Sequence, residues 1–170
     1  MAEAKFTGFK MKVSLPFLGI EGNWAVDNKQ REAAWEIYVE LVTRVTVQEL
    51  KEDEGFLREA LTSFYSLFGI TRGILKTYGP TIATPGQADD TTLGHIAVAV
   101  LNKVLRPLLA KWHPILKDYE DKRPKDRSTT EHERQWEHAA ELRAEIEKVR
   151  GQLTEYADVL AEVSGVSKLH

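Results

Sequence analysis

Residues 93–119 read LGHIAVAVLNKVLRPLLAKWHPILKDY and decide the fold, because they form the most apolar run of the chain. From residue 93 to residue 101 the run is apolar almost all the way round, and a helix without a polar face is normally buried on every side. We therefore expect a central helix that the other segments cover. Pro107 and Pro114 each remove a backbone hydrogen bond, so this helix should be kinked or broken.

Three further segments carry helical periodicity. Residues 30–50 have apolar positions at helical spacing with Glu32, Glu36, Glu40 and Arg44 on the opposite face, and residues 54–78 carry a continuous apolar stripe. From residue 139 to residue 163 apolar residues repeat at alternating steps of three and four, which is a heptad seam. The sequence thus predicts an all-α fold, an antiparallel four-helix bundle with a kinked central third helix and a long fourth helix.

Local signals predict where these helices begin and end. Asp27 or Asn28 can cap the first, Gly79-Pro80 ends the second, and Asp89 or Asp90 is expected to cap the third. The last helix should begin at the capping box Ser128-Thr129-Thr130-Glu131 and stop at Gly165.

An extended arm is expected before the bundle. Residues 9–15 alternate apolar and polar side chains, with Phe9, Met11, Val13 and Leu15 on one face, before Pro16 ends the pattern. We expect a turn at residues 22–24. The predicted organisation is an arm at 1–22, a single helical domain at 23–166 and a tail at 167–170. The arm either packs along the bundle or pairs with another chain by strand addition. That other chain is either a different protein or a second copy, which would make a homo-oligomer.

Two helical features suggest contact surfaces. A last helix of about 35 residues spans roughly 50 Å, longer than the first helix can cover. Its N-terminal part should overhang, which makes His132 and Trp136 candidate partner-binding residues. Gly69 and Gly73 lie one helical turn apart in the second helix, where we expect a neighbouring helix to cross closely.

Composition excludes several classes of protein. The chain has 170 residues, 42% of them hydrophobic, and a net charge of −3, which argues against broad non-specific nucleic-acid binding. It has no cysteine, so disulfides and thiolate sites are excluded. Neither a signal peptide nor a membrane span is expected, because lysine, arginine and proline interrupt the apolar stretches. The expectation is a soluble, cytoplasmic protein.

Few residues are arranged for chemistry. The five histidines show no Glu-x-x-His pair, and no nucleophile elbow or phosphate loop occurs, so neither a metal nor another cofactor is expected. Arg106 and His113 are seven residues apart on one helix face, and Arg127 and His132 are spaced similarly. An arginine to hold a phosphate and a histidine to move protons suit metal-independent RNA cleavage.

These two pairs resemble the R-x4-6-H motif of the HEPN family, helical-bundle ribonucleases that commonly act as dimers in bacterial conflict systems. The segments AAWEIYVELVTRV, LREALTSFYSLF, VLNKVLRPLLAKWHP and EHERQWEHAAELRAEI are similar to a group of uncharacterised bacterial helical proteins. These features support two hypotheses. The preferred one is a non-catalytic interaction or regulatory module that binds another protein within a bacterial defence or stress system; the alternative is a HEPN-like ribonuclease that acts on RNA.

Overall fold

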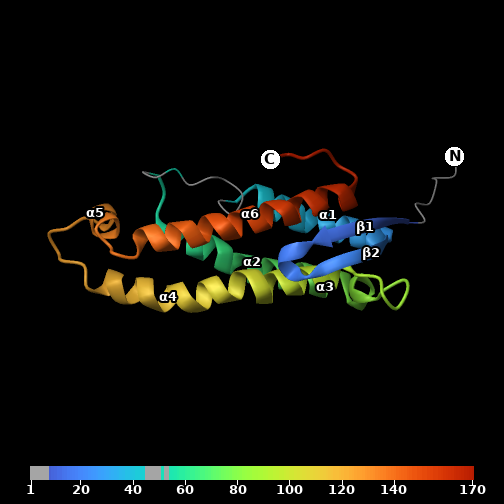
Figure 1. Ribbon diagram of the computed structural model, residues 1–170, viewed down its shortest axis with the longest axis horizontal. Helices are drawn as coiled ribbons and strands as arrows, with labels where there is room; N and C mark the ends of the chain where they lie inside the picture. The colour runs from blue at the N-terminus through green and yellow to red at the C-terminus, as the bar shows by residue number, and fades with distance from the viewer. Residues whose placement is uncertain (1–7, 45–50, 52–53) are drawn as a thin grey trace.

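The protein is a mostly helical chain with a two-stranded antiparallel sheet at its N-terminal end (Figure 1). The structure, a computed structural model, describes residues 8–44, 51 and 54–170. Strand β1 (Phe9–Leu15) and strand β2 (Ile20–Val26) form the sheet, and the hairpin lies at the opposite end of the molecule from helix α5 (Thr129–Arg134) (Figure 1). The prediction of a purely all-α four-helix bundle is therefore wrong.

The predicted arm is the first strand of this hairpin. Phe9 pairs with Val26 and Leu15 with Ile20, joined by the 3₁₀ turn η1 (Pro16–Leu18) and Gly19, whose φ of 66° suits glycine. The expected turn at residues 22–24 and the expected domain boundary at residue 22 both fall inside β2.

The apolar face of the arm points into the core of its own chain. Val13 and Leu15 are 3% and 0% exposed, while Met11 is half-buried and Phe9 is exposed. In the folded chain, Val13 and Leu15 are thus not available to a partner. The apolar face that suggested strand addition packs instead against the hydrophobic core of the same chain.

A buried glutamine ties the hairpin to the helices. Gln30, 2% exposed, accepts hydrogen bonds through Oε1 from the Trp24 indole Nε1 at 2.6 Å and from the Leu93 backbone N–H at 3.1 Å. Its Nε2 donates to the Ala25 carbonyl at 3.0 Å. One side chain therefore joins β2, helix α1 (Asn28–Val42) and helix α3 (Leu93–Ala99).

Helix α1 and helix α2 (Leu57–Tyr78) lie side by side in opposite directions, as Tyr78–Glu36 and Arg44–Ser66 contacts show. The Asp27 cap is confirmed, since its side chain accepts from the Gln30 N–H at 2.8 Å. Gly79, with φ 74°, ends α2 before the 3₁₀ turn η2 (Pro80–Ala83) as predicted. The first helix, predicted to run to about residue 50, ends at Val42. Residues 45–50 of that prediction lie outside the described residues.

The central apolar run is a continuous helical segment whose middle is widened. A π-helical stretch, η3 (Val100–Leu105), joins α3 to helix α4 (Arg106–Asp121). Opening the hydrogen-bond ladder just before Pro107 accommodates a residue that has no N–H to donate. Pro114 lies inside α4. Thr92, and neither Asp89 nor Asp90, caps the segment, by accepting from the His95 N–H.

This segment, Leu93–Asp121, is the single helix among the described residues that is long and apolar enough to cross a membrane. Within its apolar window 61% of the residues are buried inside the protein, which is what the core helix of a soluble protein shows.

The expected long last helix is broken. Helix α5 ends at Arg134, and helix α6 (Ala139–Ser164) starts after a turn. The capping box at Ser128 and Glu131 is present, the heptad positions of α6 face the core, and Gly165 ends α6 with φ 71°. Because α5 folds over the end of the helical part (Figure 1), the predicted overhang is not found.

The structure also tests two smaller expectations, the close helix crossing at Gly69 and Gly73 and the separate tail at 167–170. Gly69 and Gly73 are exposed, and a Cβ at either would meet no atom within 4 Å, so no helix of the described chain crosses there. The tail predicted at 167–170 lies against the helices, where the Leu169 N–H donates to the Tyr38 hydroxyl at 2.7 Å.

Candidate functional site

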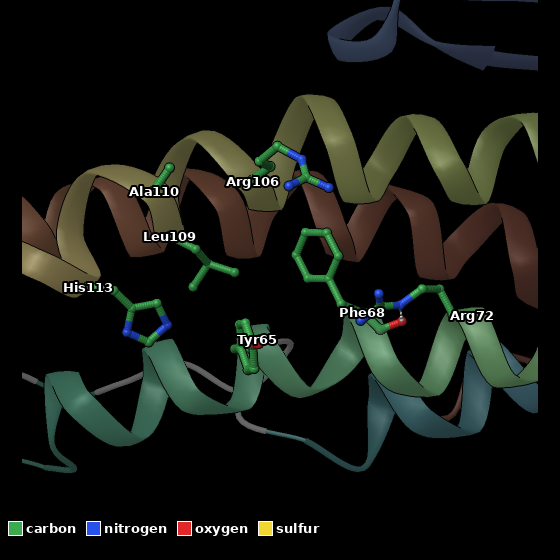
Figure 2. A pocket seen from close by; sticks show the side chains of 7 residues that line it. All are labelled: Tyr65, Phe68, Arg72, Arg106, Leu109, Ala110 and His113. Carbon is green, nitrogen blue, oxygen red and sulfur yellow. Dashed lines mark hydrogen bonds between the residues drawn. The ribbon is translucent and has the colours of Figure 1, made fainter.

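An open pocket of about 340 Å³ lies between α2 and α4 (Figure 2). The two helices run in opposite directions, so the middle of α2 faces the first half of α4. Both members of the Arg106/His113 pair line the pocket. The lining residues are Tyr65, Phe68 and Arg72 from α2, and Arg106, Leu109, Ala110 and His113 from α4.

The pocket presents two exposed guanidinium groups. Arg106 donates from Nε and Nη2 to the Asn102 side-chain oxygen at 3.1 and 3.0 Å, and its Cζ lies 5.3 Å from the centre of the Phe68 ring. Arg72 donates from Nε to the Phe68 carbonyl at 3.1 Å. Figure 2 shows Arg106 reaching from α4 toward the Phe68 ring, with Arg72 beside it on α2.

Neither guanidinium group pairs with a carboxylate of the described chain. Arginine carries five N–H donors, and the contacts of Arg72 and Arg106 occupy only part of them. Both side chains thus keep charge and donors for an anionic group that enters from solvent.

His113 is held by an arginine behind the pocket. Its Nδ1 lies 2.8 Å from Nη1 of Arg58, and the Arg58 guanidinium also forms a bidentate pair with Glu120, with distances of 2.9 to 3.1 Å. Arginine can only donate, so Nδ1 is the acceptor and the hydrogen of the neutral imidazole sits on Nε2.

The same surroundings keep His113 neutral. Burial lowers the pKa of His113, and the adjacent Arg58 cation lowers it further, against a smaller opposing effect of Glu120. A neutral imidazole whose Nδ1 is occupied offers one N–H and no free lone pair. At neutral pH His113 therefore acts as a hydrogen-bond donor, while a general base needs an available lone pair.

Aromatic rings form the floor of the pocket. Tyr65 is 60% exposed, which is unusual for so large a side chain, and its ring meets the His113 ring edge to face at 5.8 Å. Together with the Phe68 ring, it offers an apolar surface beside the two cations. The pocket thus combines positive charge, hydrogen-bond donors and exposed aromatic carbon.

The second predicted pair is arranged differently. His132 is 5% exposed, stacks on Tyr119 with ring centres 4.0 Å apart, and places Nε2 2.8 Å from the Tyr119 carbonyl oxygen. Arg127 is half-buried in the preceding loop, and its carbonyl accepts a hydrogen bond from Arg123. A phosphodiester has no access to a histidine buried in this way, so His132 cannot transfer protons in RNA cleavage as the Arg127/His132 pair was predicted to do.

Trp136, the other residue of the predicted partner surface, is also buried. It is 5% exposed and packs edge to face on Trp112 at 5.8 Å and stacked on Tyr119 at 5.4 Å. The aromatic residues that suggested an overhanging surface instead hold α5 onto α4. His132 and Trp136 stabilise the fold at this end of the molecule.

The residues that complete the pocket come from α2. Tyr65 and Arg72 are seven residues apart, which places them on one face of the helix, and Arg58 lies a further seven residues upstream of Tyr65. This spacing marks a common face, but nothing in the sequence of α2 indicates that α4 lies against it.

In the described part of the chain, no three or more His, Asp or Glu side chains come together in a way that could hold a metal ion. Comparisons of the chain with models of protein families, with curated proteins and with solved structures find no match.

Proposed function

We propose that the chain is a non-catalytic interaction module that binds an acidic segment of another protein in the pocket between α2 and α4. The observation that carries the proposal is the pair of exposed guanidinium groups, Arg72 and Arg106, that no carboxylate of the described chain neutralises. Charge complementarity of this kind selects partners and speeds encounter.

The aromatic rings add to the proposal. Arg, Tyr and Phe are enriched at protein interfaces, and side chains that carry binding energy sit in pockets where the partner excludes water. Tyr65 and Phe68 lie beside the arginines, so the favoured ligand carries an apolar or aromatic residue next to its carboxylates. The bacterial origin and the defence or stress role stay predictions.

The experiment is a selection of random peptides displayed on phage against purified wild-type protein and an Arg72→Ala/Arg106→Ala variant. Wild type should enrich peptides rich in Asp and Glu with an aromatic residue, and the variant should not. Lys117→Ala/Lys122→Ala is the matched control, because it removes two exposed lysines of the same helical region that pair with Asp121 and Asp118. Equal enrichment by wild type and the arginine variant would refute the proposal.

A ribonuclease is the second candidate, because Arg106 and His113 line one solvent-accessible pocket. Cleavage would need a base to take the 2′-hydroxyl proton and an acid to protonate the leaving 5′-oxygen. The Nδ1 contact with Arg58 speaks against His113 in either role. The test is to incubate end-labelled RNA in the presence of a chelator with wild type, Arg106→Ala and His113→Ala. If wild type cleaves the RNA and both variants do not, the ribonuclease function replaces the interaction proposal.

A further inference from the structure

A groove separate from the α2–α4 pocket lies where α1 meets the C-terminal end of α2 and the end of α6. Its volume is about 510 Å³. Helix α1 lines it with Glu32, Trp35 and Glu36, α2 lines it with Tyr78, and α6 lines it with Ser164. None of these residues lines the α2–α4 pocket, so the groove is a second surface for contact with other molecules.

Two exposed carboxylates give this groove negative charge. Glu32 accepts a hydrogen bond at 2.9 Å from an asparagine side chain one turn earlier on α1, and Glu36 accepts one at 2.5 Å from the Tyr78 hydroxyl. Neither carboxylate pairs with a lysine or arginine of the described chain. Arg31 also lines the groove, and its Nε donates to the Ser164 carbonyl at 3.0 Å. Both carboxylates therefore keep oxygens that can accept from an incoming cation.

The ring of Trp35 is exposed between these carboxylates. Trp35 is 40% exposed, which is unusual for so large a side chain. Glu32 lies three residues before Trp35 and four residues before Glu36, so the three side chains share one edge of α1. Tryptophan is among the residues that carry most binding energy at protein interfaces. We call Glu32, Trp35 and Glu36 the acidic face of α1.

The acidic face has the composition that the α2–α4 pocket favours in a ligand. The pocket presents the guanidinium groups of Arg72 and Arg106 beside two aromatic rings, and the acidic face presents two carboxylates beside one aromatic ring. Opposite charges across an interface select the partner, and an arginine side chain also packs favourably on an indole ring. The two surfaces are therefore complementary both in charge and in aromatic content.

Within one chain the two surfaces face different ways. Helix α2 contacts both α1 and α4 (Figure 1). Arg72 and Tyr78 are six residues apart on α2, which is about one and two-thirds helical turns, so the pocket and the groove lie on different sides of this helix. No hydrogen bond in the described part of the chain joins Arg72 or Arg106 to the acidic face. Both surfaces are thus open to another molecule.

We propose that the chain binds a second copy of itself, with the acidic face of α1 in one copy docked on the α2–α4 pocket of the next. The carboxylates of Glu32 and Glu36 then meet the two guanidinium groups, and Trp35 lies against the aromatic rings of the pocket. This inference rests on the proposed function, because it names a second copy as the source of the acidic segment. Each copy carries both surfaces, so the contact is head to tail and gives a ring or an open chain of copies.

The test is analytical ultracentrifugation of the full chain. Wild type should self-associate with a Kd of about 10 µM to 1 mM, as a small and polar interface does. The association should weaken as the salt concentration rises, because the charges are exposed. Glu32→Gln/Glu36→Gln and Arg72→Ala/Arg106→Ala should each weaken it at least about tenfold. Asp118→Asn/Asp121→Asn, which removes two exposed carboxylates that pair with lysines of α4, is the matched control and should leave the association unchanged.

Mixing the two interface variants gives the sharpest result. The glutamine variant keeps the pocket and the alanine variant keeps the acidic face, so an equal mixture should form one-to-one dimers that do not grow further. Failure of the mixture to associate, or self-association that persists in both variants, would overturn the inference.

Binding of the peptide acetyl-Glu-Phe-Glu amide separates this inference from the proposed function. A wild-type protein that stays monomeric but binds the peptide through Arg72 and Arg106 would overturn the inference, and the acidic segment would then come from a different protein. A wild-type protein that stays monomeric and does not bind the peptide would overturn both proposals.

Discussion

Replacing Gln30 by leucine should destabilise the protein strongly, because it leaves two buried donors without an acceptor. The Trp24 indole N–H and the Leu93 backbone N–H both bond to Gln30 Oε1, and Trp24 and Leu93 are each 0% exposed. Each stranded donor costs about 1–3 kcal/mol, so the free energy of unfolding should fall by about 2–6 kcal/mol.

Urea denaturation followed by circular dichroism measures this loss. A double-mutant cycle with Trp24→Phe isolates the indole bond, since in the Trp24→Phe background no indole N–H is left to strand. The cost of Gln30→Leu should therefore be smaller by about 1–3 kcal/mol in that background. A loss below about 1 kcal/mol for Gln30→Leu, with an unchanged m value, would refute the reasoning that this side chain joins the hairpin to the helices.

Three further predictions concern single side chains. Leu15→Ala should lower the free energy of unfolding by about 2–5 kcal/mol in a denaturant melt, because Leu15 is 0% exposed; an unchanged midpoint would mean that β1 is a free arm. Arg58→Gln should raise the pKa of His113 toward its ordinary value of 6.5, because the variant removes a neighbouring cation that lowers this pKa. Burial still lowers the pKa in the variant, so the rise should be partial. An NMR titration measures the pKa, and a lower pKa in the variant would contradict the assigned contact. Glu133→Gln should gain stability relative to wild type as the pH rises from about 4 to 7. Burial raises the pKa of Glu133, so ionisation of this carboxyl above that pKa lowers the stability of wild type and not that of the variant. Urea melts across this pH range measure the difference, and a difference that does not change with pH would contradict the prediction.

Local signals predicted much of the helical part. The stripe of α2, its stop at Gly79-Pro80 and the capping box at Ser128 each depend on residues within a few positions of one another. Such signals survive tertiary packing because the backbone conformation that they favour is the one that packing uses.

Strand β2 was missed because its sequence, IEGNWAV, carries turn residues. Gly22 and Asn23 usually mark turns, but here they pair with Val13 and Lys12 of β1, and Trp24 and Val26 bury their side chains. The pairing of β1 with the segment that follows it depends on contacts between the two strands. The alternation of apolar and polar side chains within one strand does not predict those contacts.

The break between α5 and α6 was missed for a similar reason. The capping box at Ser128 and the heptad seam that begins at Ala139 were assigned to one continuous helix. The packing of Trp136 on Trp112 and Tyr119 explains why α5 turns back, and this tertiary contact has no signal in the sequence. Likewise, Arg106 and His113 could be placed on one face from the sequence because they share a helix. Arg72 and Tyr65 could not be joined to them, because the approach of α2 to α4 is a tertiary contact.

The most direct test of the central claim, that the α2–α4 pocket binds acidic partner segments, is an NMR titration of ¹⁵N-labelled protein with the probe peptide acetyl-Glu-Phe-Glu amide. The claim predicts amide shifts concentrated on residues 65–72 and 106–113, and their loss in Arg72→Ala/Arg106→Ala. Shifts centred on the hairpin or on α5, or shifts that persist in the arginine variant, would contradict it.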